Sequence, residues 1–503
     1  MHLQRIRVPD FRVLKDVDIT FEKDFVPRIF PLGSLNGGGK STLLQLIFTL
    51  LHCSTDPEKK PFLQNLLYGF NLREDSPKRT LAIIDIWDKD KVVSIEFFVC
   101  QDSDIKSCLS LNDKPELIDN SWLKFSASED LEDLSFKISV LEKAIDSLDN
   151  IKMTIATTFD DDLFNNKEAE LIVKSKKILM DLQKLGIFPN KIVTPLLEKQ
   201  KIPIEQAIRI CAKRLDLYRG LIEKYKSVLP RIKEYMKQEN LLFILKNKTS
   251  IKDTKSENVL LCNIKLNEFK IDDIDDKISE NKTFLIHLSQ KTFLAAPSTQ
   301  VFLFMEQEKR SLLFKSQAIE SDNYYSQIQA AKSQLMNLFT YDFLAVDILI
   351  QAFKDARDRD FREAIETGEY GNYYQRLKNE LNQMLFNKKI NIDKDFNGVN
   401  FTLDRNGETI KLSPEDLSHG ELKRLSIYMW LKHHNIEDAI VLMDEIEIAF
   451  HPDWQYQIIQ DLQEWAPNNQ YILATHSYEL CQALTPAHVK EIEPKLIKQA
   501  PEN

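Results

Sequence analysis

Hydrophobic and polar residues alternate at the start of the chain, and this alternation predicts short β-strands. Residues 3–8 follow it, and residues 17–21 follow it again after an intervening turn. A third apolar stretch, 28–32, leads into a glycine-rich segment, after which the apolar spacing of residues 42–47 indicates the beginning of a helix. The order strand, glycine-rich loop, helix is therefore predicted near the start of the chain.

Two continuous apolar runs far along the chain are typical of strands buried on both faces. Residues 440–443 are followed by Asp444 and Glu445, and residues 471–474 are followed by a threonine and His476. Because the carboxyl ends of neighbouring parallel strands meet at one edge of a sheet, we expect these polar residues to lie together. A carboxylate pair and a histidine at such an edge are candidates for metal binding and acid–base chemistry.

A capped helix is predicted from Ser418 through Trp430. Ser418 is a favourable N-cap residue, and Glu421 stands at the position that completes a capping box. Taken alone, this pattern is that of an ordinary well-capped helix. Its position shortly before the acid pair, in a chain that also carries the glycine-rich loop, favours a functional interpretation.

The long middle of the chain has helical periodicity. Apolar residues recur every three or four positions in two stretches, the second bounded by Pro203 and Pro230, as in the seam between paired helices. The members of the two stretches are Leu131, Leu134, Ile138, Leu141, Ile145 and Leu148, and Ile204, Ile208, Cys211, Leu215, Tyr218, Ile222, Tyr225 and Leu229. Two alternatives remain open, namely short arms that contact a partner and an ordinary helical-bundle core.

Composition limits the class of protein. The 503 residues are 43% hydrophobic and 29% charged, which is typical of a globular protein. The six cysteines form no Cys-x-x-Cys pair, which argues against a zinc site, and the chain has neither a long apolar run nor a signal-peptide pattern. We therefore expect a cytoplasmic protein without a membrane partner.

The net charge of −10 provides no overall field that attracts nucleic acid. A DNA contact would need a local basic patch, for which the aromatic and basic residues 373–378 are one candidate. A solvated face of an amphipathic helix explains the same pattern equally simply. DNA is thus a partner that composition neither supports nor excludes.

Glycine is rare in this chain but concentrated in one loop. Only 12 glycines occur, and four of them lie between positions 33 and 39. Backbone N–H groups in such a loop can surround phosphate oxygens at the N-terminus of the following helix. Lys40 is expected to reach the outer phosphates, and the Ser41 hydroxyl is expected to bind Mg²⁺. The predicted ATP-binding residues of the loop are Asn36, Gly37, Gly38, Gly39, Lys40, Ser41 and Thr42.

The remaining site predictions follow from the chemistry of ATP hydrolysis. Asp444 is expected to hold the metal together with Ser41, and Glu445 to polarise the attacking water as the general base. His476 is a candidate contact to the outermost phosphate. The loop departs from the usual pattern at its entry, where Ser34 replaces the first glycine. His433 and His434 lack the surrounding residues of a nuclease metal site, so we do not assign them to one.

Together these motifs resemble the ATPase head of ABC-type proteins, in the branch that includes RecF, SMC and OLD proteins. The resemblance covers residues 1–50 and 400–480 and includes the turn 10–14, the loop, the Leu-Ser-His-Gly-Glu segment at 417–421 and the run 444–452. It implies an α/β fold with a mixed sheet, interrupted by a large, mostly α-helical insertion. It also implies ATP and Mg²⁺ as cofactors.

In the same family, the residues matching Ser418 and Gly420 touch the ATP bound to a second subunit, and we group Glu421 with them. Arg12 resembles a nucleotide contact, and Gln300 is a candidate metal-sensing glutamine. The resemblance therefore implies a homodimer, or a higher even oligomer, that closes around two ATP molecules.

The domain boundaries expected from these patterns divide the chain into alternating head and helical segments. They are 1–125 for the N-terminal lobe of the head, 126–255 for the helical insertion, 256–300 for the return to the head sheet, 301–390 for a helical subdomain, and 391–503 for the C-terminal lobe. The stretch after His476 is too short for the nuclease domain of OLD proteins.

An ATPase that lacks an effector domain of its own is expected to control a separate effector, and a nuclease subunit is the expected partner. The layout resembles the ATPases of anti-phage systems of the Septu type. The alternative is a DNA repair or chromosome-maintenance ATPase similar to RecF and SMC proteins. A transporter subunit is disfavoured by the long insertion, and a scaffold without hydrolysis is disfavoured by Glu445 and His476.

Overall fold

The computed structural model divides the chain into two compact units. Unit 1 contains Met1–Gln101 and Ile244–Asn503, and unit 2 contains Asp102–Phe243. The structure describes residues 1–34, 37–72, 78–89, 91–101, 241–248, 257–266, 274–301, 304–305, 324–341, 346–405 and 408–492, together with parts of 138–149 and 212–230. The predicted helical insertion, 126–255, contains the strand Leu241–Lys248 near its end, and its start lies outside the described residues.

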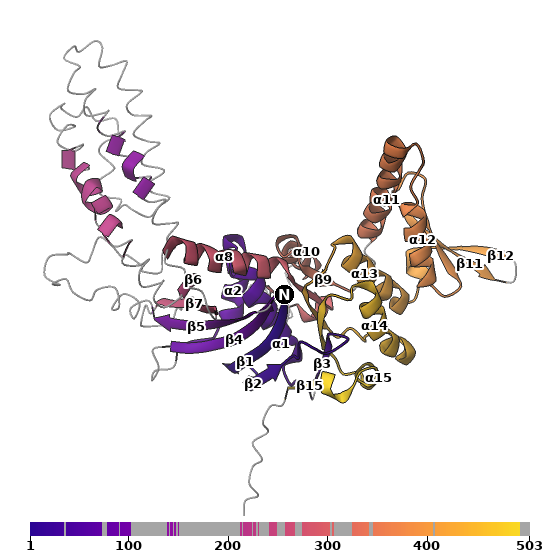
Figure 1. Ribbon diagram of the computed structural model, residues 1–503, viewed down its shortest axis with the longest axis horizontal. Helices are drawn as coiled ribbons and strands as arrows, with labels where there is room; N and C mark the ends of the chain where they lie inside the picture. Colours follow the sequence, from indigo (N-terminus) through magenta and orange to yellow (C-terminus); the bar gives the residue numbers. More distant parts are fainter. Residues whose placement is uncertain are drawn as a thin grey trace, which may run out of the picture. The chain divides into compact units, whose positions relative to one another are not determined.

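One sheet of unit 1 is built mainly from the N-terminal residues (Figure 1). Its strand order is β2 (Leu14–Thr20), β1 (His2–Phe11), β4 (Lys78–Asp88), β5 (Lys91–Gln101), β7 (Glu257–Leu266) and β6 (Leu241–Lys248). The pairs β1–β2, β1–β4, β4–β5 and β5–β7 are antiparallel. The alternating pattern of residues 3–8 and 17–21 thus forms two neighbouring strands, as predicted.

The second sheet is parallel and brings the two ends of the chain together. Its strand order is β15 (Lys490–Glu491), β3 (Ile29–Gly33), β14 (Gln470–Ala474), β13 (Ile440–Asp444), β8 (Thr292–Ala296) and β9 (Leu338–Thr340). Strands β13 and β14 are buried along their whole length, which explains why both are continuous apolar runs in the sequence. The predicted α/β fold with a P-loop head is confirmed.

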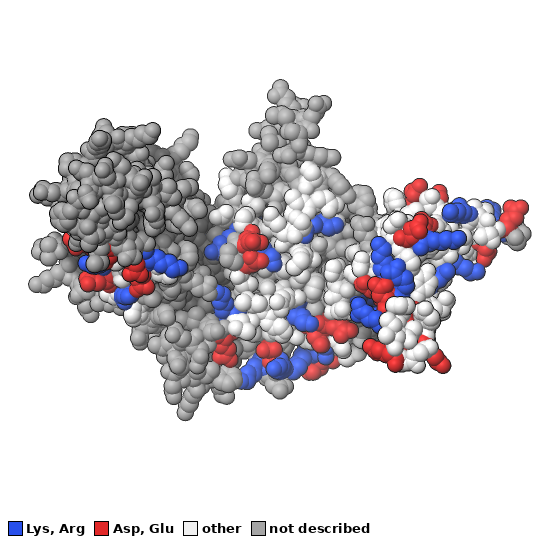
Figure 2. All heavy atoms as spheres, turned by 90° about the horizontal axis from the view of Figure 1, so that it is seen from above, with Lys and Arg blue, Asp and Glu red and all other residues white. Residues whose placement is uncertain are grey.

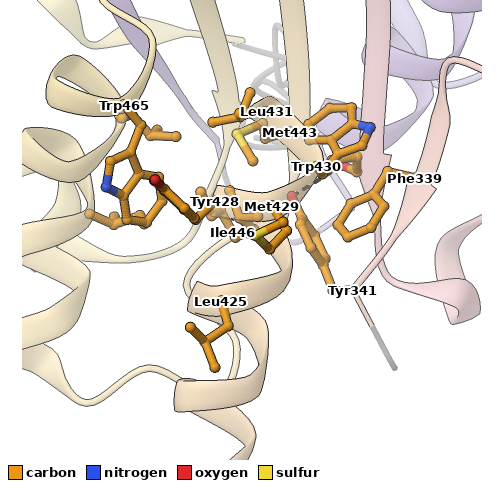
Figure 3. Close-up of a cluster of buried hydrophobic side chains, with 14 of the residues drawn as sticks. Phe339, Tyr341, Leu425, Tyr428, Met429, Trp430, Leu431, Met443, Ile446 and Trp465 are labelled. Carbon is orange, nitrogen blue, oxygen red and sulfur yellow. Dashed lines mark hydrogen bonds between the residues drawn. The ribbon is translucent and has the colours of Figure 1, made fainter. Parts of the chain in front are cut away.

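Helices cover this parallel sheet. Helix α1 (Lys40–Cys53) contacts β8 and β13 and packs against α2 (Lys60–Leu67) and α8 (Ile274–Gln290). Helix α13 (His419–His433) contacts α14 (Pro452–Trp465), and α14 contacts α15 (Tyr478–Gln482). Figure 3 shows the core that α13 helps to form, in which the Trp430 ring stacks on Phe339 with centroids 5.0 Å apart.

Residues 301–390, predicted to be helical, are mixed. They contain α10 (Tyr324–Gln334), α11 (Val346–Thr367) and α12 (Tyr373–Gln383), but also strand β9. Helices α11 and α12 lie side by side, and a small antiparallel sheet follows them (Figure 1). Its strands are β10 (Lys388–Ile392), β11 (Val399–Arg405) and β12 (Glu408–Leu412).

Within unit 2, the described residues before Leu241 are helical and belong to the two predicted apolar stretches, and Leu241–Phe243 begin strand β6. Lys226 Nζ donates to Glu142 at 2.8 Å, and Arg219 pairs with Asp149 at 3.0 Å. The later residue of the second segment, Lys226, pairs with the earlier residue of the first, Glu142, and Arg219 pairs with the later Asp149. The two segments therefore run antiparallel. Leu141 and Tyr218 are buried within them. The other members of the two stretches, such as Leu131 and Ile204, lie outside the described residues.

Candidate functional site

The glycine-rich loop follows β3 directly and ends at the first residue of α1. Gly37 and Gly39 have φ angles of 79° and 89°, in the left-handed region that side chains other than glycine rarely adopt. The first turn of α1 contains no acidic residue, so its N–H groups and the favourable end of the helix dipole remain suitable for an anion. Leu35 and Asn36 lie outside the described residues, so the predicted contact of Asn36 remains a prediction.

The turn between β1 and β2 lies against this loop. A Cβ atom added to Gly39 would be 2.6 Å from Leu14 Cδ2 and 2.9 Å from Val13 Cγ2, closer than van der Waals contact allows. Gly39 is therefore required by packing as well as by its φ angle. The same turn carries Arg12, which is exposed and donates from Nη2 to the Leu66 carbonyl at 3.1 Å. This contact joins the turn to helix α2.

Lys40 lies buried beside the loop entry. Its Nζ atom donates to the carbonyl and to the hydroxyl of Ser34, at 3.2 Å and 3.1 Å. Burial lowers the pKa of the Lys40 amine below its ordinary value, and the charges of Glu447, Asp444 and Glu445 partly offset this effect. The serine that replaces the usual glycine at position 34 thus has a structural use, because it holds the lysine next to the site.

Ser41 and Asp444 meet at the carboxyl end of β13. The Ser41 hydroxyl donates to Asp444 Oδ1 at 2.9 Å, across 403 positions of the sequence. Strand β14, which lies between β3 and β13, fixes this arrangement, since it pairs with both in parallel register. The loop and the acid strand therefore form one site.

Asp444 is the electrostatically unusual residue of this site. Burial raises the pKa of its carboxyl group to about 7, and the neighbouring acids add to the effect, while the hydrogen bond from Ser41 opposes it. Its Oδ2 atom is buried and has no hydrogen-bond partner among the residues that the structure describes. A buried carboxylate oxygen without a donor fits a divalent cation, which would replace the missing hydrogen bond.

Glu445 begins a tight turn after β13. Its φ angle is 50°, in the left-handed region, and its N–H donates to the Ala474 carbonyl at 2.9 Å. Its side chain is half-buried, so it can approach both the site and solvent. A glutamate in this backbone conformation is held there by its surroundings, which include Lys423 of α13, whose Nζ donates to the Glu445 carbonyl at 3.0 Å.

Glu447 is a site residue that sequence reasoning missed. It is 9% exposed, and its Oε1 accepts a 2.7 Å hydrogen bond from the N–H of His476. The two turns that follow β13 and β14 are therefore joined by a side chain. The His476 imidazole is exposed, which leaves it available to a ligand. The only signal in the sequence was that Glu447 lies in the same acidic run as Asp444 and Glu445.

Ser418 caps α13 as predicted. Its Oγ accepts from the Glu421 N–H at 3.3 Å, and its own backbone N–H donates to Glu421 Oε2 at 3.0 Å, which completes the capping box. The Ser418 hydroxyl also donates to Glu421 Oε2 at 2.9 Å. Lys388, the first residue of β10, donates to both Glu421 oxygens at 2.7 Å. Burial by itself would raise the pKa of the Glu421 carboxyl group. The hydrogen bonds from Lys388 and Ser418 outweigh burial and hold this pKa below its ordinary value.

The three predicted contacts to a second nucleotide differ in exposure. Ser418 is exposed at the helix N-terminus, whereas Glu421 is 4% exposed and its carboxylate is used by the cap and Lys388. Gly420 is also buried, and a Cβ atom at this position would be 2.8 Å from the Ala449 carbonyl oxygen. Glu421 thus orients Ser418 through hydrogen bonds, and Gly420 packs closely against the Ala449 carbonyl.

Gln300, the candidate metal-sensing glutamine, follows a strand of the parallel sheet. Gln300 ends a short 3-10 turn, Ser298–Gln300, just after β8, whose neighbour in the sheet is β13. Its backbone thus follows the strand next to Asp444, while its side chain lies outside what the structure describes. No group of three or more His, Cys, Asp or Glu residues suited to hold a metal occurs among the described residues.

The residues present fit ATP and Mg²⁺. Left-handed glycines, a free helix N-terminus and Lys40 can hold the phosphates, and Ser41 with the buried Asp444 can hold the cation.

The surface away from this site carries charges of both signs. Figure 2 shows Lys and Arg interspersed with Asp and Glu over the visible described surface. No helix among the described residues is long and apolar enough to span a membrane.

Comparison with known proteins identifies a matching family over part of the chain. Residues 304–482 match the family described as "AAA domain, putative AbiEii toxin, Type IV TA system". This segment contains Ser418, Asp444 and His476 but not the glycine-rich loop.

Two curated relatives match short segments. The chain is 44% identical over 54 residues to the "Retron Vc95 probable ATPase" of Vibrio cholerae serotype O1 biovar El Tor, which is 11% of this chain and 10% of the relative. It is 44% identical over 46 residues to the "Retron Ec83 probable ATPase" of Escherichia coli, which is 9% of this chain and 8% of the relative. The matched segments thus span about a tenth of the length of these relatives.

Among solved structures, the Smc head domain of Pyrococcus furiosus with bound ScpA C-terminal domain matches with 10% identity and a TM-score of 0.29, covering 96% of this chain and 91% of that chain. The Smc head domain of Pyrococcus yayanosii matches with 11% identity and the same TM-score, covering 96% of this chain and 93% of that one. The chain is thus similar, over parts of its length, to a family described as an AAA domain and to two probable ATPases of retrons.

Proposed function

We propose that this protein binds and hydrolyses ATP, that two copies close around two ATP molecules, and that this switch controls a separate effector. The observation that carries the proposal is the hydrogen bond between Ser41 and Asp444, beside the buried Lys40. It joins a phosphate-binding loop to an acidic strand end, which is the arrangement that phosphoryl transfer from a nucleoside triphosphate requires.

The loop residues supply binding and orientation. The N–H groups at the start of α1 and the Lys40 ammonium neutralise phosphate charge, and Lys40 must exchange its hydrogen bonds with Ser34 for bonds to phosphate oxygens. Mg²⁺ would be held by Ser41 and Asp444 and would supply charge stabilisation at the phosphates. Glu445, half-buried and carried on a fixed turn, takes the proton of the attacking water.

The exposed Ser418 supports the participation of a second copy. Ser418 stands at the N-terminus of a 15-residue helix, where N–H groups favour an anion, and its hydroxyl is oriented by Glu421. In a two-fold symmetric pair, this N-terminus meets the outermost phosphate bound at Lys40 of the other copy. Only a triphosphate offers contacts to both copies, so hydrolysis releases the pair.

The relatives are named as probable ATPases of retrons, and the matching family is described as an AAA domain and a putative toxin of a type IV TA system. We propose a separate effector because the assigned motifs account for ATP binding and hydrolysis alone. A nuclease subunit is the partner that we expect, in defence against phage. The alternative, a DNA-repair ATPase, predicts ATP hydrolysis that is stimulated by DNA and binding that weakens steeply with salt.

The decisive test uses the Glu445→Gln variant with ATP and Mg²⁺. Light scattering after size-exclusion chromatography should show a dimer with ATP and a smaller species with ADP. Products of neighbouring genes should co-purify with the protein and should change in nuclease activity between the two nucleotides. A natural chain that neither binds nor hydrolyses ATP would refute the proposal.

A further inference from the structure

Lys423 is a buried cation that the assignments above leave without a function. It lies on α13, in the second turn after Ser418, and is 5% exposed. Its Nζ atom lies 4.0 Å from the centre of the Tyr341 ring and 5.5 Å from that of Phe450, so the charge is enclosed by aromatic faces. Burying an ammonium group is costly, and a methionine would fill such a place without that cost.

The hydrogen bonds of Lys423 explain why a cation occupies this position. Nζ donates to the carbonyl of Glu445 at 3.0 Å and to the carbonyl of Ile448 at 3.1 Å. These two carbonyls belong to the turn that presents the Glu445 carboxylate. The turn is conformationally demanding, because Glu445 and Ala449 have φ angles of 50° and 71°.

A second contact joins the same two segments. Gly420 packs so closely on the Ala449 carbonyl that a Cβ atom would approach it to 2.8 Å. The first turns of α13 and the segment 445–449 are thus held together at both ends of the turn. A shift of the N-terminus of α13 would move the Glu445 backbone with it.

We propose that Lys423 is a positioning residue that couples the two ATP sites, so that contact of Ser418 with ATP in the partner's site sets Glu445 for hydrolysis in its own site. This inference rests on the proposed function, because it requires shared sites. The chemistry is that of directed hydrogen bonds from one ammonium group to two carbonyls of a strained turn. The consequence is that neither ATP is hydrolysed efficiently until the other is engaged.

The first experiment does not depend on activity. Hydrogen–deuterium exchange is measured at residues 446–450, where the Ile448 N–H bonds to the Glu445 carbonyl and the Phe450 N–H bonds to the Glu447 carbonyl. In Lys423→Met, these amides should exchange several-fold faster than in the natural chain. Unchanged exchange would overturn the inference, whether or not the protein hydrolyses ATP.

Arg424→Met is the matched control. Arg424 is the next residue of α13 and is also a partly buried cation, but it pairs with Asp461 of α14 at 2.6 Å and 2.7 Å. Its removal should lower thermal stability without changing exchange at 446–450 or the kcat of the folded protein. Equal effects of the two variants would mean that Lys423 contributes only to general stability, and would overturn the inference.

Steady-state kinetics separates positioning from binding. Lys423→Met should lower kcat by about 10- to 100-fold, as expected for a displaced catalytic group, and leave the dissociation constant of ATP within about twofold. Lys423→Arg keeps the charge and can donate to both carbonyls, so it should recover most of the kcat. A loss of ATP affinity with unchanged kcat would contradict the assigned role.

Heterodimers identify the site on which Lys423 acts. With Lys423→Met and Glu445→Gln in the same chain, both changes affect one site, and the other site should keep its rate. With the two changes in opposite chains, each site carries one change, and hydrolysis should fall to the level of the Lys423→Met homodimer or below. The reverse order of rates, or equal rates, would overturn the proposal.

Discussion

Ser41 and Asp444, which lie 403 positions apart, share a hydrogen bond of 2.9 Å at the end of β13. This bond is made to one oxygen of a carboxyl group whose other oxygen is buried without a hydrogen-bond partner among the described residues. The site thus holds a carboxylate that is costly to ionise until a cation arrives. This relationship predicts that the proposed binding of Mg²⁺ and ATP is sensitive to pH.

The first prediction concerns that sensitivity. Burial raises the pKa of Asp444 to about 7, so its proton must leave when Mg²⁺ binds. The affinity for Mg²⁺ with ATP should therefore rise about tenfold between pH 6 and pH 8. Isothermal titration calorimetry measures it, and Asp444→Asn, corrected for the titration of ATP itself, should show a flat profile. A flat profile in the natural chain would contradict the assignment.

The raised pKa of Asp444 also makes the folding stability of the ligand-free protein depend on pH. Because the folded pKa of Asp444 lies above its unfolded value, this carboxyl contributes stability at low pH that is lost as the pH rises through about 7. Asp444→Asn should consequently raise the melting temperature of the ligand-free protein at pH 8 more than at pH 5. Differential scanning calorimetry at the two pH values gives the comparison.

Lys40→Ala should weaken ATP binding on the order of 100-fold, because it removes a buried charge that bonds directly to phosphate. A fluorescent ATP analogue measures the affinity. Lys389→Ala is the control, since Lys389 forms an exposed ion pair with Asp404 at 3.1 Å. Unaltered affinity in Lys40→Ala would show that the loop does not bind the phosphates.

Glu445→Gln should slow hydrolysis by about 10²- to 10⁴-fold, because the water loses its general base. The amide keeps the shape of the side chain, so ATP binding should persist and the dimer should accumulate. Phosphate release and molar mass are measured on the same sample. A monomeric variant that hydrolyses ATP rapidly would exclude Glu445 as the base.

Mixing two inactive variants tests the shared site. In a heterodimer of Ser418→Arg with Glu445→Gln, both changes fall in one site if Ser418 acts on the partner's ATP, and the other site is intact. The intact site combines Lys40 of the Ser418→Arg chain with Ser418 of the Glu445→Gln chain, so the mixture should form heterodimers that hold ATP between the chains, whereas Ser418→Arg alone should stay monomeric with ATP. If each variant behaves in the mixture as it does alone, Ser418 serves the site of its own chain.

Lys388→Met should destabilise the protein by about 2 kcal/mol, because the buried Glu421 carboxylate loses charge-assisted hydrogen bonds. The hydrogen bonds that lower the pKa of Glu421 stabilise the fold above its unfolded pKa, and this contribution is lost as the pH falls through the folded pKa. The deficit of the variant should shrink accordingly in acid. Adding Glu421→Gln should recover part of the stability at neutral pH, and a further loss would contradict the pairing.

The sequence predicted the elements that carry strong local patterns. Residues 440–443 and 471–474 are buried strands, and Ser418 with Glu421 forms a capping box, because periodicity and cap chemistry depend on neighbouring residues. Strand β9 within the predicted helical subdomain was missed, since it has only three residues and its pairing with β8 is tertiary.

The supporting residues of the site could not be predicted in the same way. Lys423 and Lys388 resemble any other lysine in the sequence, and their role arises from partners 22 to 33 positions away. Glu421 was grouped with the nucleotide contacts, but its burial and its ion pair become visible only in three dimensions. Sequence motifs identify the residues proposed to react. The residues that position them are scattered along the chain and carry no motif.

Both motif glycines that pack closely, Gly39 and Gly420, press against other segments of their own chain, at Leu14 and at the Ala449 carbonyl. Gly39→Ala would therefore displace the turn between β1 and β2, and Gly420→Ala would displace the turn that contains Ala449. Loss-of-function alleles at these two glycines will report steric displacement together with any lost nucleotide contact. Variants of Ser418 and Lys40, whose side chains can be shortened without a clash, give the cleaner genetic readout.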